Sequence, residues 1–411
     1  MIRQVRIAVI GQGYVGLTIS VGALTAGHKV IGVDLSDSVI AGLRDGKSHI
    51  EGISDEQISQ GVTSGNFEPV NSYHLVEGSD LVVIAVPTPL DSSGAPDLSL
   101  LNSASTSLGT ALKKPTLIIN ESTSYPGTLR DLIRPLIDKG SGLSHEYAVS
   151  PERVDPGNKR YGSRNTPRIV GGLSDQARDK AIAFYRTFCD EVIPVSSAEV
   201  AEAAKLFENT FRFINIGLVN EFAQIMSAMA IPVDEVLEAA ASKPYGFMPF
   251  HPNIGIGGHC IPVDPLYLQA KAEQAGQISK YIALSEQINH EMPRYVAERL
   301  VAQSGGIKAK RVLVVGIAYK ADIADTRESP AKVFIDHLKE FGAEVFWHDP
   351  IVSSWNAQSS SDISDKYDLA VVLVAHTGFS MKGWAGGPIF TVRANPKFPD
   401  WEPLISLRPD K

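Results

Sequence analysis

The first 34 residues contain the pattern that most restricts the fold: a strand, a glycine turn, a helix, a second strand and an acid. Residues 5–10 (VRIAVI) form a short apolar run typical of a buried parallel strand. The segment GQGYVG follows at 11–16 and leads into the helical stretch LTISVGALTAG. A second strand, KVIGVD, ends at Asp34. This order predicts an α/β fold with a doubly wound sheet.

The glycines and the acid of this segment predict a dinucleotide site. Glycines permit a tight turn and the close approach of a pyrophosphate to the helix N-terminus. A carboxylate at Asp34 can accept hydrogen bonds from both ribose hydroxyls and would repel a 2′-phosphate, which favours NAD over NADP. The alternative is a structural turn in another α/β domain, but the flanking strands, helix and acid all favour NAD.

Three further segments, 80–91, 115–128 and 146–158, each combine an apolar run with a polar or proline-rich loop. In a doubly wound sheet, ligands bind beyond the carboxyl ends of the strands. We therefore predict that these three loops line the cofactor site.

The last third of the chain repeats the opening pattern. The segments 311–320, 343–350 and 367–376 parallel the first, second and third strand segments of the opening. The second copy has no glycine fingerprint and carries Lys320 and Arg327 in the corresponding loop. We expect a second Rossmann-like domain adapted to a different ligand.

Between these two parts, residues 198–230 contain no proline, and their apolar side chains recur at helical spacing. At 1.5 Å per residue such a helix is roughly 50 Å long. We interpret it as a connection between domains and a homodimer contact, with a monomeric core helix as the alternative. The predicted domains are an NAD-binding Rossmann domain (1–197), a central helical domain (198–300) and a Rossmann-like domain (301–411).

Composition excludes several classes of function. The net charge of -8, without a dense Lys/Arg stripe, argues against a nucleic-acid binder. The sequence contains no run of about 18 apolar residues, so it predicts no membrane span. The N-terminus does not resemble a signal peptide. We therefore expect a cytoplasmic protein with no membrane partner. The 2 cysteines form no C-x-x-C pair, and we predict neither a disulfide framework nor a metal site.

One cysteine lies in an unusual setting. A free cysteine is most often a small buried apolar residue, which is our interpretation of Cys189. Cys260, however, lies in the glycine-rich segment NIGIGGHCIPVDP, where a thiol could act as a nucleophile. On the predicted long helix, Lys205 and Asn209 are one turn apart and could present a cation and an amide to one small group. A solvated helix face is the alternative for these two residues.

An NAD site together with a nucleophilic thiol indicates a particular reaction sequence. Hydride transfer converts an alcohol to an aldehyde, which a thiolate captures as a thiohemiacetal. A second hydride transfer gives a thioester, and water hydrolyses it to an acid. One cofactor site, used twice, would suffice for this four-electron oxidation.

Seven segments together resemble the UDP-glucose/GDP-mannose dehydrogenase family of nucleotide-sugar 6-dehydrogenases. They are GQGYVG, VPTPL, ESTSYPGT, SPERVDPGN, KLFENTFRFINIGLVNE, GIGGHCIPVDP and GIAYKADIADTRESP. The likeness is closest to the UDP-N-acetylglucosamine 6-dehydrogenase branch. It implies NAD as cofactor and a UDP-N-acetylhexosamine as substrate of the C-terminal domain, with UDP-N-acetylmannosamine and UDP-glucose as alternatives.

The resemblance also implies a role for each matching residue. Cys260 matches the nucleophile, Lys205 and Asn209 match donors to the C6 oxygen, and Asp264 matches the carboxylate that holds the hydrolytic water. Glu152 and Thr123 complete the predicted catalytic set. The implied cofactor contacts are Gly11, Gly13, Tyr14, Val15, Gly16, Asp34, Pro87, Thr88, Thr123, Glu152 and Arg327. The implied substrate contacts are Glu152, Arg153, Lys205, Asn209, Phe250, His251, Gly255, Gly257, Lys320 and Arg393.

The C-terminal tail departs from the family pattern. Family members usually end with an arginine beside an aspartate, whereas the segment 388–401 offers Arg393 without that aspartate. Two other classes of function are weaker alternatives. A two-electron NAD dehydrogenase of small hydroxy acids needs neither a nucleophilic thiol nor a second Rossmann-like domain. A non-catalytic NAD-binding protein would lack part of the Lys, Asn, Cys and Asp set, which is complete here.

Overall fold

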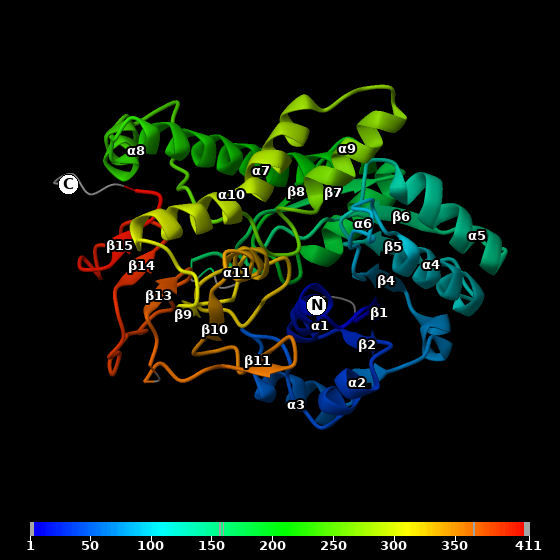
Figure 1. Cartoon of the computed structure of the whole chain (residues 1–411). Helices are drawn as coiled ribbons and strands as arrows, with labels where there is room; N and C mark the ends of the chain where they lie inside the picture. The colour runs from blue at the N-terminus through cyan, green and yellow to red at the C-terminus, as the bar shows by residue number, and fades with distance from the viewer. Residues whose placement is uncertain (1–3, 156–157, 159, 365, 407–411) are drawn as a thin grey trace. The chain divides into compact units, whose positions relative to one another are not determined.

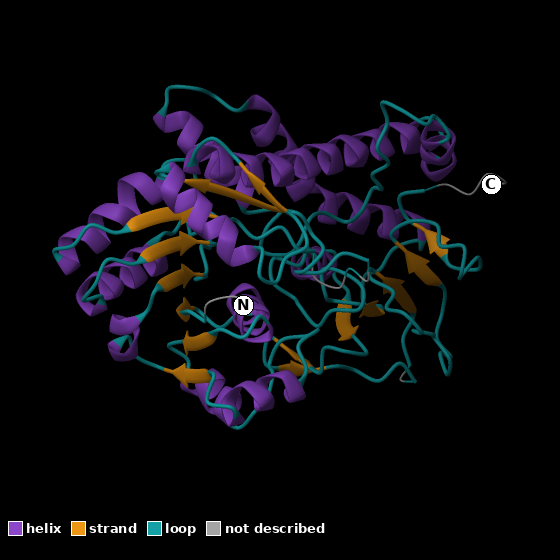
Figure 2. Cartoon of the chain, turned by 180° about the vertical axis from the view of Figure 1, so that it is seen from behind, coloured by secondary structure: helices purple, strands orange, loops and turns teal. Residues whose placement is uncertain are grey.

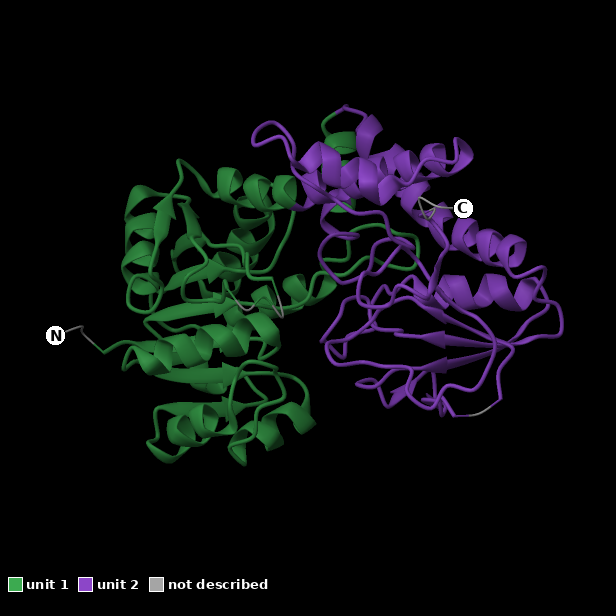
Figure 3. Cartoon of the chain, turned by 90° about the vertical axis from the view of Figure 1, so that its left-hand side faces the viewer, with its two compact units in different colours: residues 1–208, 266–275 green, residues 209–265, 276–411 purple. Residues whose placement is uncertain are grey.

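The structure is a computed structural model and describes residues 4–155, 158, 160–364 and 366–406. The chain forms two compact units (Figure 3), residues 1–208 with 266–275 and residues 209–265 with 276–411. The division falls inside the helix α7 (Ala198–Ala228). The three predicted domains, with limits at 197/198 and 300/301, stay a prediction.

The first unit contains a twisted sheet in the order β3-β2-β1-β4-β5-β6-β7-β8 (Figure 1). β6 and β7 pair antiparallel, and the other neighbours pair in parallel. The strand order around β1 is that of a dinucleotide-binding Rossmann sheet, so the predicted fold class is confirmed. The strands are β1 (Arg6–Ile10), β2 (Lys29–Val33), β3 (Phe67–Val70), β4 (Leu81–Ile84), β5 (Leu117–Asn120), β6 (Glu146–Val149), β7 (Arg168–Gly172) and β8 (Val192–Pro194).

Helices cover both faces of this sheet (Figure 2), because successive side chains of a buried strand point to opposite sides. Ile7 and Val9 of β1 pack in one core cluster with α1 and α6, while Ala8 and Ile10 pack in another with α4 and α5. The helices are α1 (Tyr14–Thr25), α2 (Asp37–Arg44), α3 (Asp55–Thr63), η1 (His74–Gly78), α4 (Ser99–Ala111), η2 (Leu129–Ile133), α5 (Arg134–Ser141) and α6 (Asp175–Tyr185).

The second unit contains a parallel sheet in the order β10-β9-β13-β14-β15. Its strands are β9 (Arg311–Val315), β10 (Glu344–His348), β13 (Leu369–Val372), β14 (Ile389–Thr391) and β15 (Glu402–Pro403), with a separate hairpin of β11 (Ser354–Trp355) and β12 (Gln358–Ser359). The repeated segments of the sequence therefore contain β9, β10 and β13, as expected. The helices are α8 (Val233–Ala241), α9 (Asp264–Gln274), α10 (Lys280–Gln303) and α11 (Ala331–Glu340), of which α9 runs on into the first unit.

The two faces of the second sheet are covered differently. Val312 and Val314 of β9 share a core cluster with Phe334 of α11. On the opposite face, Leu313 packs with aromatic side chains from connecting segments, Trp401 among them. This unit is thus a Rossmann-like sheet with helices on one face and loop side chains on the other.

The long helix predicted over 198–230 is α7. Its apolar side chains fall on two faces: Phe213 and Val219 are buried, whereas Phe207, Leu218 and Met229, just beyond its end, are 60–67% exposed. Much of the apolar spacing seen in the sequence therefore lies outside the core of the chain. None of the helices in the described residues combines the length and apolar character needed to cross a membrane.

Candidate active site

The turn between β1 and α1 has the geometry that a dinucleotide requires. Gly11 has a φ of +89°, and a Cβ there would lie 2.3 Å from the carbonyl oxygen of Ala85. A Cβ on Gly16 would lie 1.8 Å from the Gly11 carbonyl oxygen. Around Gly13, by contrast, no atom of the described residues lies within 4 Å of a Cβ position. α1 begins at Tyr14, beside this open backbone, and its N-terminal N–H groups favour a phosphate there.

Asp34 directly follows β2 and is fixed by backbone donors. The Gln12 N–H donates to Asp34 Oδ2 at 2.8 Å, and the Ser36 N–H donates to Asp34 Oδ1 at 2.9 Å. The carboxylate remains only partly buried. It is therefore oriented at the strand end, as the ribose contact predicted from the sequence requires.

A serine that the sequence analysis did not assign joins two of the predicted cofactor loops. Ser122 Oγ donates to the Val86 carbonyl oxygen at 2.8 Å and accepts from the Val86 N–H at 2.9 Å. Pro87 and Thr88 follow Val86, and Thr123 follows Ser122. The hydroxyl thus ties together the two segments that carry these three predicted cofactor contacts.

Glu152, three residues after β6, is held at both carboxylate oxygens. Its Oε1 accepts from the backbone N–H groups of Arg153 and Val154 at 2.7 and 2.8 Å, and its Oε2 accepts from Arg168 at 2.9 Å. Burial alone would raise the pKa of Glu152, but the charges of Arg168 and Lys205 and the two N–H donors outweigh it and lower the pKa. The carboxylate is therefore ionised and fixed in orientation.

The predicted pair on α7 is buried. Lys205 is 8% exposed and Asn209 is 5% exposed, so the solvated-face alternative is wrong for both. Arg153, a predicted substrate contact after β6, forms an ion pair at 2.6 Å with Glu208, which is also on α7, and donates to the Pro167 carbonyl. A cation and an amide thus share one buried face of α7.

In the second unit, Cys260 begins the turn that leads into α9. Its carbonyl oxygen accepts from the N–H groups of Val263 and Asp264 at 3.2 and 2.9 Å. The Asn209 side chain donates to Asp264 Oδ2 at 2.5 Å, across 55 residues of sequence. Cys260 is half-buried, whereas Cys189 is buried, as its packing interpretation predicts. Three of the predicted catalytic residues, Cys260, Asp264 and Asn209, therefore lie in one neighbourhood.

The loop after β9 packs on the glycines before Cys260. The Gly258 N–H donates to the Arg327 carbonyl at 3.0 Å, and a Cβ on Gly257 would lie 2.5 Å from Tyr319 Cβ. The Arg327 side chain pairs with Asp325 at 2.6 Å and interacts electrostatically with Cys260. Arg327, predicted as a cofactor contact, therefore lies near the thiol in this unit. Lys320 is half-buried in the same loop.

The segment that carries the predicted substrate contacts Phe250, His251 and Gly255 is anchored by an asparagine to which the sequence had given no role. Asn220, on α7 and fully buried, accepts from the Asn253 N–H at 2.8 Å and donates to Asn289 on α10 at 2.9 Å. Partial desolvation and the charge of Arg393 lower the pKa of His251, so these two predicted substrate contacts are near enough to interact electrostatically. An asparagine among the apolar residues of the predicted long helix was the available signal in the sequence.

Family models match the chain in three successive segments. They are the NAD binding domain (5–189), the central domain (199–291) and the UDP binding domain (313–391) of the UDP-glucose/GDP-mannose dehydrogenase family. The chain belongs to the UDP-glucose/GDP-mannose dehydrogenase family. It is an NAD-dependent oxidoreductase, which confirms the resemblance and the predicted cofactor.

Relatives of this dehydrogenase carry different substrate names. A UDP-N-acetyl-D-glucosamine 6-dehydrogenase from Pseudomonas aeruginosa is 33% identical over 403 residues, 93% of each chain. The solved UDP-D-ManNAc dehydrogenase from Pyrococcus horikoshii is 31% identical with a TM-score of 0.86, covering 94% of this chain and 95% of that one. A UDP-glucose dehydrogenase from Pyrobaculum islandicum, at 24% identity, shares the fold with a TM-score of 0.89 and 98% coverage of both chains.

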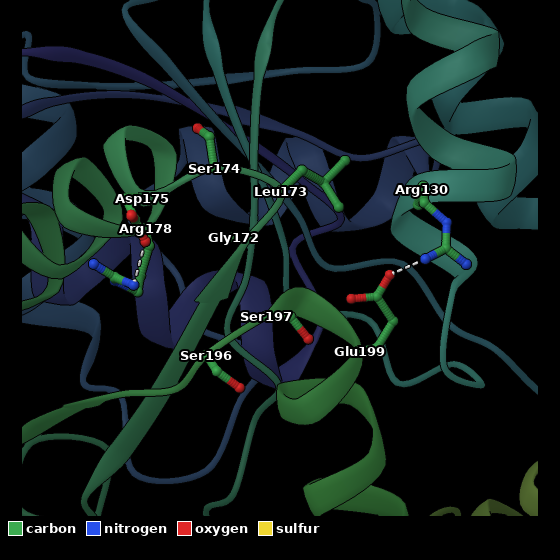
Figure 4. Close-up of a pocket in the computed structure, with 9 residues that line it drawn as sticks. All are labelled: Arg130, Gly172, Leu173, Ser174, Asp175, Arg178, Ser196, Ser197 and Glu199. Carbon is green, nitrogen blue, oxygen red and sulfur yellow. Dashed lines mark hydrogen bonds and ion pairs between the residues drawn. The ribbon is translucent and has the colours of Figure 1, made fainter.

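The dehydrogenase also has a cavity of about 410 Å³ at the beginnings of α6 and α7 (Figure 4). Among the described residues, none of those predicted for the site lines it. Its two arginines, Arg130 and Arg178, are paired with Glu199 and Asp175. The lining is therefore close to neutral, and the cavity is separate from the candidate active site. In the described residues, no group of three or more His, Cys, Asp or Glu side chains could hold a metal ion.

Proposed function

We propose that this dehydrogenase oxidises the C6 hydroxymethyl group of a UDP-N-acetylhexosamine to a carboxylate through a thioester on Cys260. UDP-N-acetylglucosamine is the first candidate substrate. The observation that carries the proposal is the hydrogen bond from Asn209 to Asp264, four residues beyond Cys260. It supports a shared task for an amide, a carboxylate and a thiol that come from separate parts of the sequence.

The surroundings of Cys260 favour a thiolate. The residue precedes the first turn of α9, and the positive end of a helix stabilises an anion. The positive charge of Arg327 acts in the same direction. A thiolate there adds to the C6 aldehyde and forms a new C–S bond, which gives the thiohemiacetal.

Lys205 and Asn209 supply donors for the oxygen of that adduct. Both are buried, and electrostatic stabilisation is strongest where water is excluded. Asn209 has two N–H protons, so one remains for the substrate while the other bonds to Asp264. One such donor is typically worth about 3 kcal/mol. The Asp264 carboxylate is oriented to hold the water that hydrolyses the thioester.

The chain offers a complete site for the cofactor. Asp34 would hold the ribose and the open backbone at Gly13 would admit the pyrophosphate, with the loop of Thr123 on the nicotinamide side. When bound, NAD accepts a hydride in each of the two oxidations. Alcohol to acid is a four-electron change, so each sugar requires two NAD and one water.

The sugar is a choice among close alternatives. Relatives of similar identity are named for UDP-N-acetyl-D-glucosamine and for UDP-D-ManNAc, so identity does not separate the epimers. The match of residues 313–391 to a UDP binding domain supports the uridine diphosphate part, with Lys320 as a contact. His251 and Arg393, which interact electrostatically, are further substrate contacts in this proposal.

The exposed face of α7 supports a homodimer. Phe211, Leu218, Ile225 and Met229 are each at least 40% exposed and recur at intervals of seven and four residues. A large apolar stripe of this kind is typical of an interface. We expect Leu218→Asp to convert a dimer to a monomer in light scattering after gel filtration, and a wild-type monomer would contradict the proposal.

The test is the NADH yield with limiting UDP-N-acetylglucosamine and excess NAD. Two NADH per sugar are expected from the wild type and from Cys189→Ala, while Cys260→Ser should release no acid. One NADH per sugar would mean that the aldehyde leaves and that the thioester is wrong. If this sugar gives no NADH, UDP-N-acetylmannosamine and UDP-glucose are tested next. No oxidation of any of the three would mean that the enzyme acts on another nucleotide sugar, and the proposed substrate would be wrong.

A further inference from the structure

A buried arginine joins two carboxylates in the first unit. Arg168 begins β7, and its side chain is 4% exposed. Its Nη1 donates to Glu121 Oε1 at 2.6 Å, and its Nη2 donates to Glu152 Oε2 at 2.9 Å. Tyr185 donates its hydroxyl proton to the same Glu121 oxygen, and its ring centre lies 4.6 Å from the guanidinium carbon. Glu121 and Tyr185 thus fix the guanidinium, whose other nitrogen holds Glu152.

The strand register explains why these residues meet. β6 and β7 run antiparallel, and Ala148 pairs with Gly172. Each step forward along one strand is matched by a step back along the other. If the same register is counted on beyond the paired residues, position 152 lies opposite position 168, which are Glu152 and Arg168. The contact therefore follows from the antiparallel turn at this end of an otherwise parallel sheet.

One arginine cannot neutralise two buried carboxylates fully, and the remaining contacts decide between them. Glu152 has two backbone N–H donors as well, and its pKa is lowered although burial opposes this. At Glu121, no partner among the described residues reaches Oε2, and burial raises the pKa to about 7. Two carboxyls with environments that push their pKa values apart divide the roles: Glu152 keeps the charge and Glu121 takes the proton first.

We propose that Arg168 is a positioning residue of the dehydrogenase reaction, which fixes the Glu152 carboxylate and keeps it ionised through a buried link to Glu121 and Tyr185. The inference rests on the proposed function and on the catalytic role at the reacting carbon that the family resemblance implies for Glu152. An ionised, oriented carboxylate there can accept a proton from the C6 hydroxyl or from the hydrolytic water. Arg168 acts through Glu152 rather than on the substrate.

Several groups besides Arg168 influence the charge on Glu152. The charged and titratable groups that face it from the surrounding elements are Arg168 of β7, Glu121 after β5, Lys205 of α7, Tyr14 of α1 and Cys189 after α6. Arg168 contacts the carboxylate through a hydrogen bond, and its charge is the largest opposition to the effect of burial. Its removal should therefore make Glu152 harder to ionise.

The decisive variant combines Arg168→Met with Glu121→Gln, because Arg168→Met alone would leave two buried carboxylates without their shared cation. We would measure kcat and KM from pH 5.5 to 9.5 with the nucleotide sugar that the wild type oxidises. At pH 7 we expect kcat to fall at least about tenfold, with KM for NAD within about twofold. The acid limb of the kcat profile should move up by about one pH unit or more.

Two further variants separate positioning from stability. Arg164→Met removes an arginine whose side chain is 80% exposed, and it should leave the profile unchanged. Arg168→Lys keeps the charge, but an ammonium group cannot bond to both carboxylates as the planar guanidinium does. The acid limb of its kcat profile should therefore lie between those of the wild type and the double variant. A wild-type kcat and acid limb in the double variant would overturn the proposal. If the double variant does not fold, an unshifted limb in Arg168→Lys would do the same.

A measurement on the protein without substrate keeps this proposal separate from the proposed function. Infrared difference spectra report protonated carboxyl groups directly. Compared with Glu121→Gln alone, the double variant should show an added protonated carboxyl band near neutral pH, and a further Glu152→Gln substitution should remove it. Absence of that band would overturn the role of Arg168 even if the enzyme oxidised UDP-N-acetylglucosamine. Its presence in a protein that oxidised no UDP-sugar would contradict only the proposed function.

Discussion

Each of the two sheets has an aspartate directly after the strand that pairs with its first strand: after β2, beside β1, and after β10, beside β9. The two aspartates differ in their burial and in their hydrogen-bond partners. Asp34 follows β2 and accepts one backbone N–H at each oxygen, while its carboxylate stays partly exposed. Asp349 follows β10, is 3% exposed, and accepts from the N–H groups of Ile317, Ala318, Ile351 and Val352 and from His376 Nε2. The same position thus leaves its carboxylate partly open to a ligand in one copy and is used by the protein itself in the other.

The internal role of Asp349 extends to the loop that carries Lys320 and Arg327. His376 Nδ1 accepts from the Asp322 N–H at 2.9 Å, and the Thr377 N–H donates to the Asp322 carboxylate at 2.6 Å. This chain of contacts ties the loop after β9 to the segment after β13. The lesson is that a repeated strand–turn–strand pattern conserves the backbone construction while the carboxylate at its end can change function.

The largest expected difference is in stability. Asp349→Asn should lower the free energy of unfolding of the second unit by about 3–5 kcal/mol, because it replaces a buried carboxylate that accepts five hydrogen bonds and leaves some of the backbone donors unpaired. Asp34→Asn should cost less than about 1 kcal/mol in the first unit, since its contacts are partly solvated. Hydrogen exchange of peptides from β9 and from β1, followed in urea, measures both. Equal losses would break the comparison.

Alanine substitution should destabilise the glycine turn after the first strand of each sheet by similar amounts. Gly11 and Gly316 have φ values of +89° and +78°, and a Cβ would lie 2.3 Å from the Ala85 carbonyl oxygen in one and 2.0 Å from that of Val374 in the other. Alanine at either position should cost about 1–3 kcal/mol by the same exchange measurement. A near-neutral Gly316→Ala would mean that the second turn is not built like the first. Gly13→Ala offers a control for the open position.

The effect on cofactor affinity should be confined to the first aspartate. We expect Asp34→Asn to raise KM for NAD about tenfold, which corresponds to about 1.4 kcal/mol, because the amide offers one acceptor fewer to the ribose. The matched Asp349→Asn variant, assayed at a temperature at which it is folded, should keep the wild-type KM for NAD. A raised KM in Asp349→Asn would place a cofactor contact in the second unit.

The two units should also differ in the sign of their pH dependence. Burial raises the pKa values of Glu121 and Glu202 to about 7 in the first unit, so their contribution to stability falls as the pH rises from about 4.5 to 7. In the second unit, the hydrogen bonds from His376 and the backbone outweigh burial and lower the pKa of Asp349 to about 2.

The Asp349 contribution is therefore present above about pH 4 and is lost as the pH falls toward 2. Each group changes stability by no more than about 1.4 kcal/mol per pH unit. Exchange-derived unfolding energies of both units between pH 2.5 and 8 test the signs. Glu121→Gln should flatten the slope of the first unit above pH 4.5, and an unchanged slope would remove Glu121 from the explanation.

Much of the fold could be predicted because it follows local rules. The apolar runs that became β1, β2, β4, β5 and β6 are each bounded by turn residues, and the repeat located β9, β10 and β13. The edge strands β3, β8 and β15 were not predicted, because short strands at the edge of a sheet depend on pairing partners more than on their own pattern. The interior strand β7 was not predicted either. The long helix α7 was predicted within two residues at its end.

The exposed side of α7 shows why periodicity alone is insufficient. Phe207 and Leu218 have the same helical spacing as a core stripe, yet both are largely exposed, while Phe213 and Val219 are buried. A hydrophobic pattern marks the surfaces that avoid water, but it does not say whether the chain itself or a second copy covers them.

By itself, the sequence determined the two Rossmann-like sheets, the NAD turn at Gly11–Gly16 and the set of site residues that the family resemblance implies. Only the tertiary structure decided the contacts between distant segments. The pairing of Asn209 with Asp264, the clamp of Asp349 by His376 and the placement of Arg168 between Glu121 and Glu152 are of this kind. The reason is physical: a local pattern fixes how each segment lies on the sheet, whereas burial forces polar groups from different segments to satisfy one another.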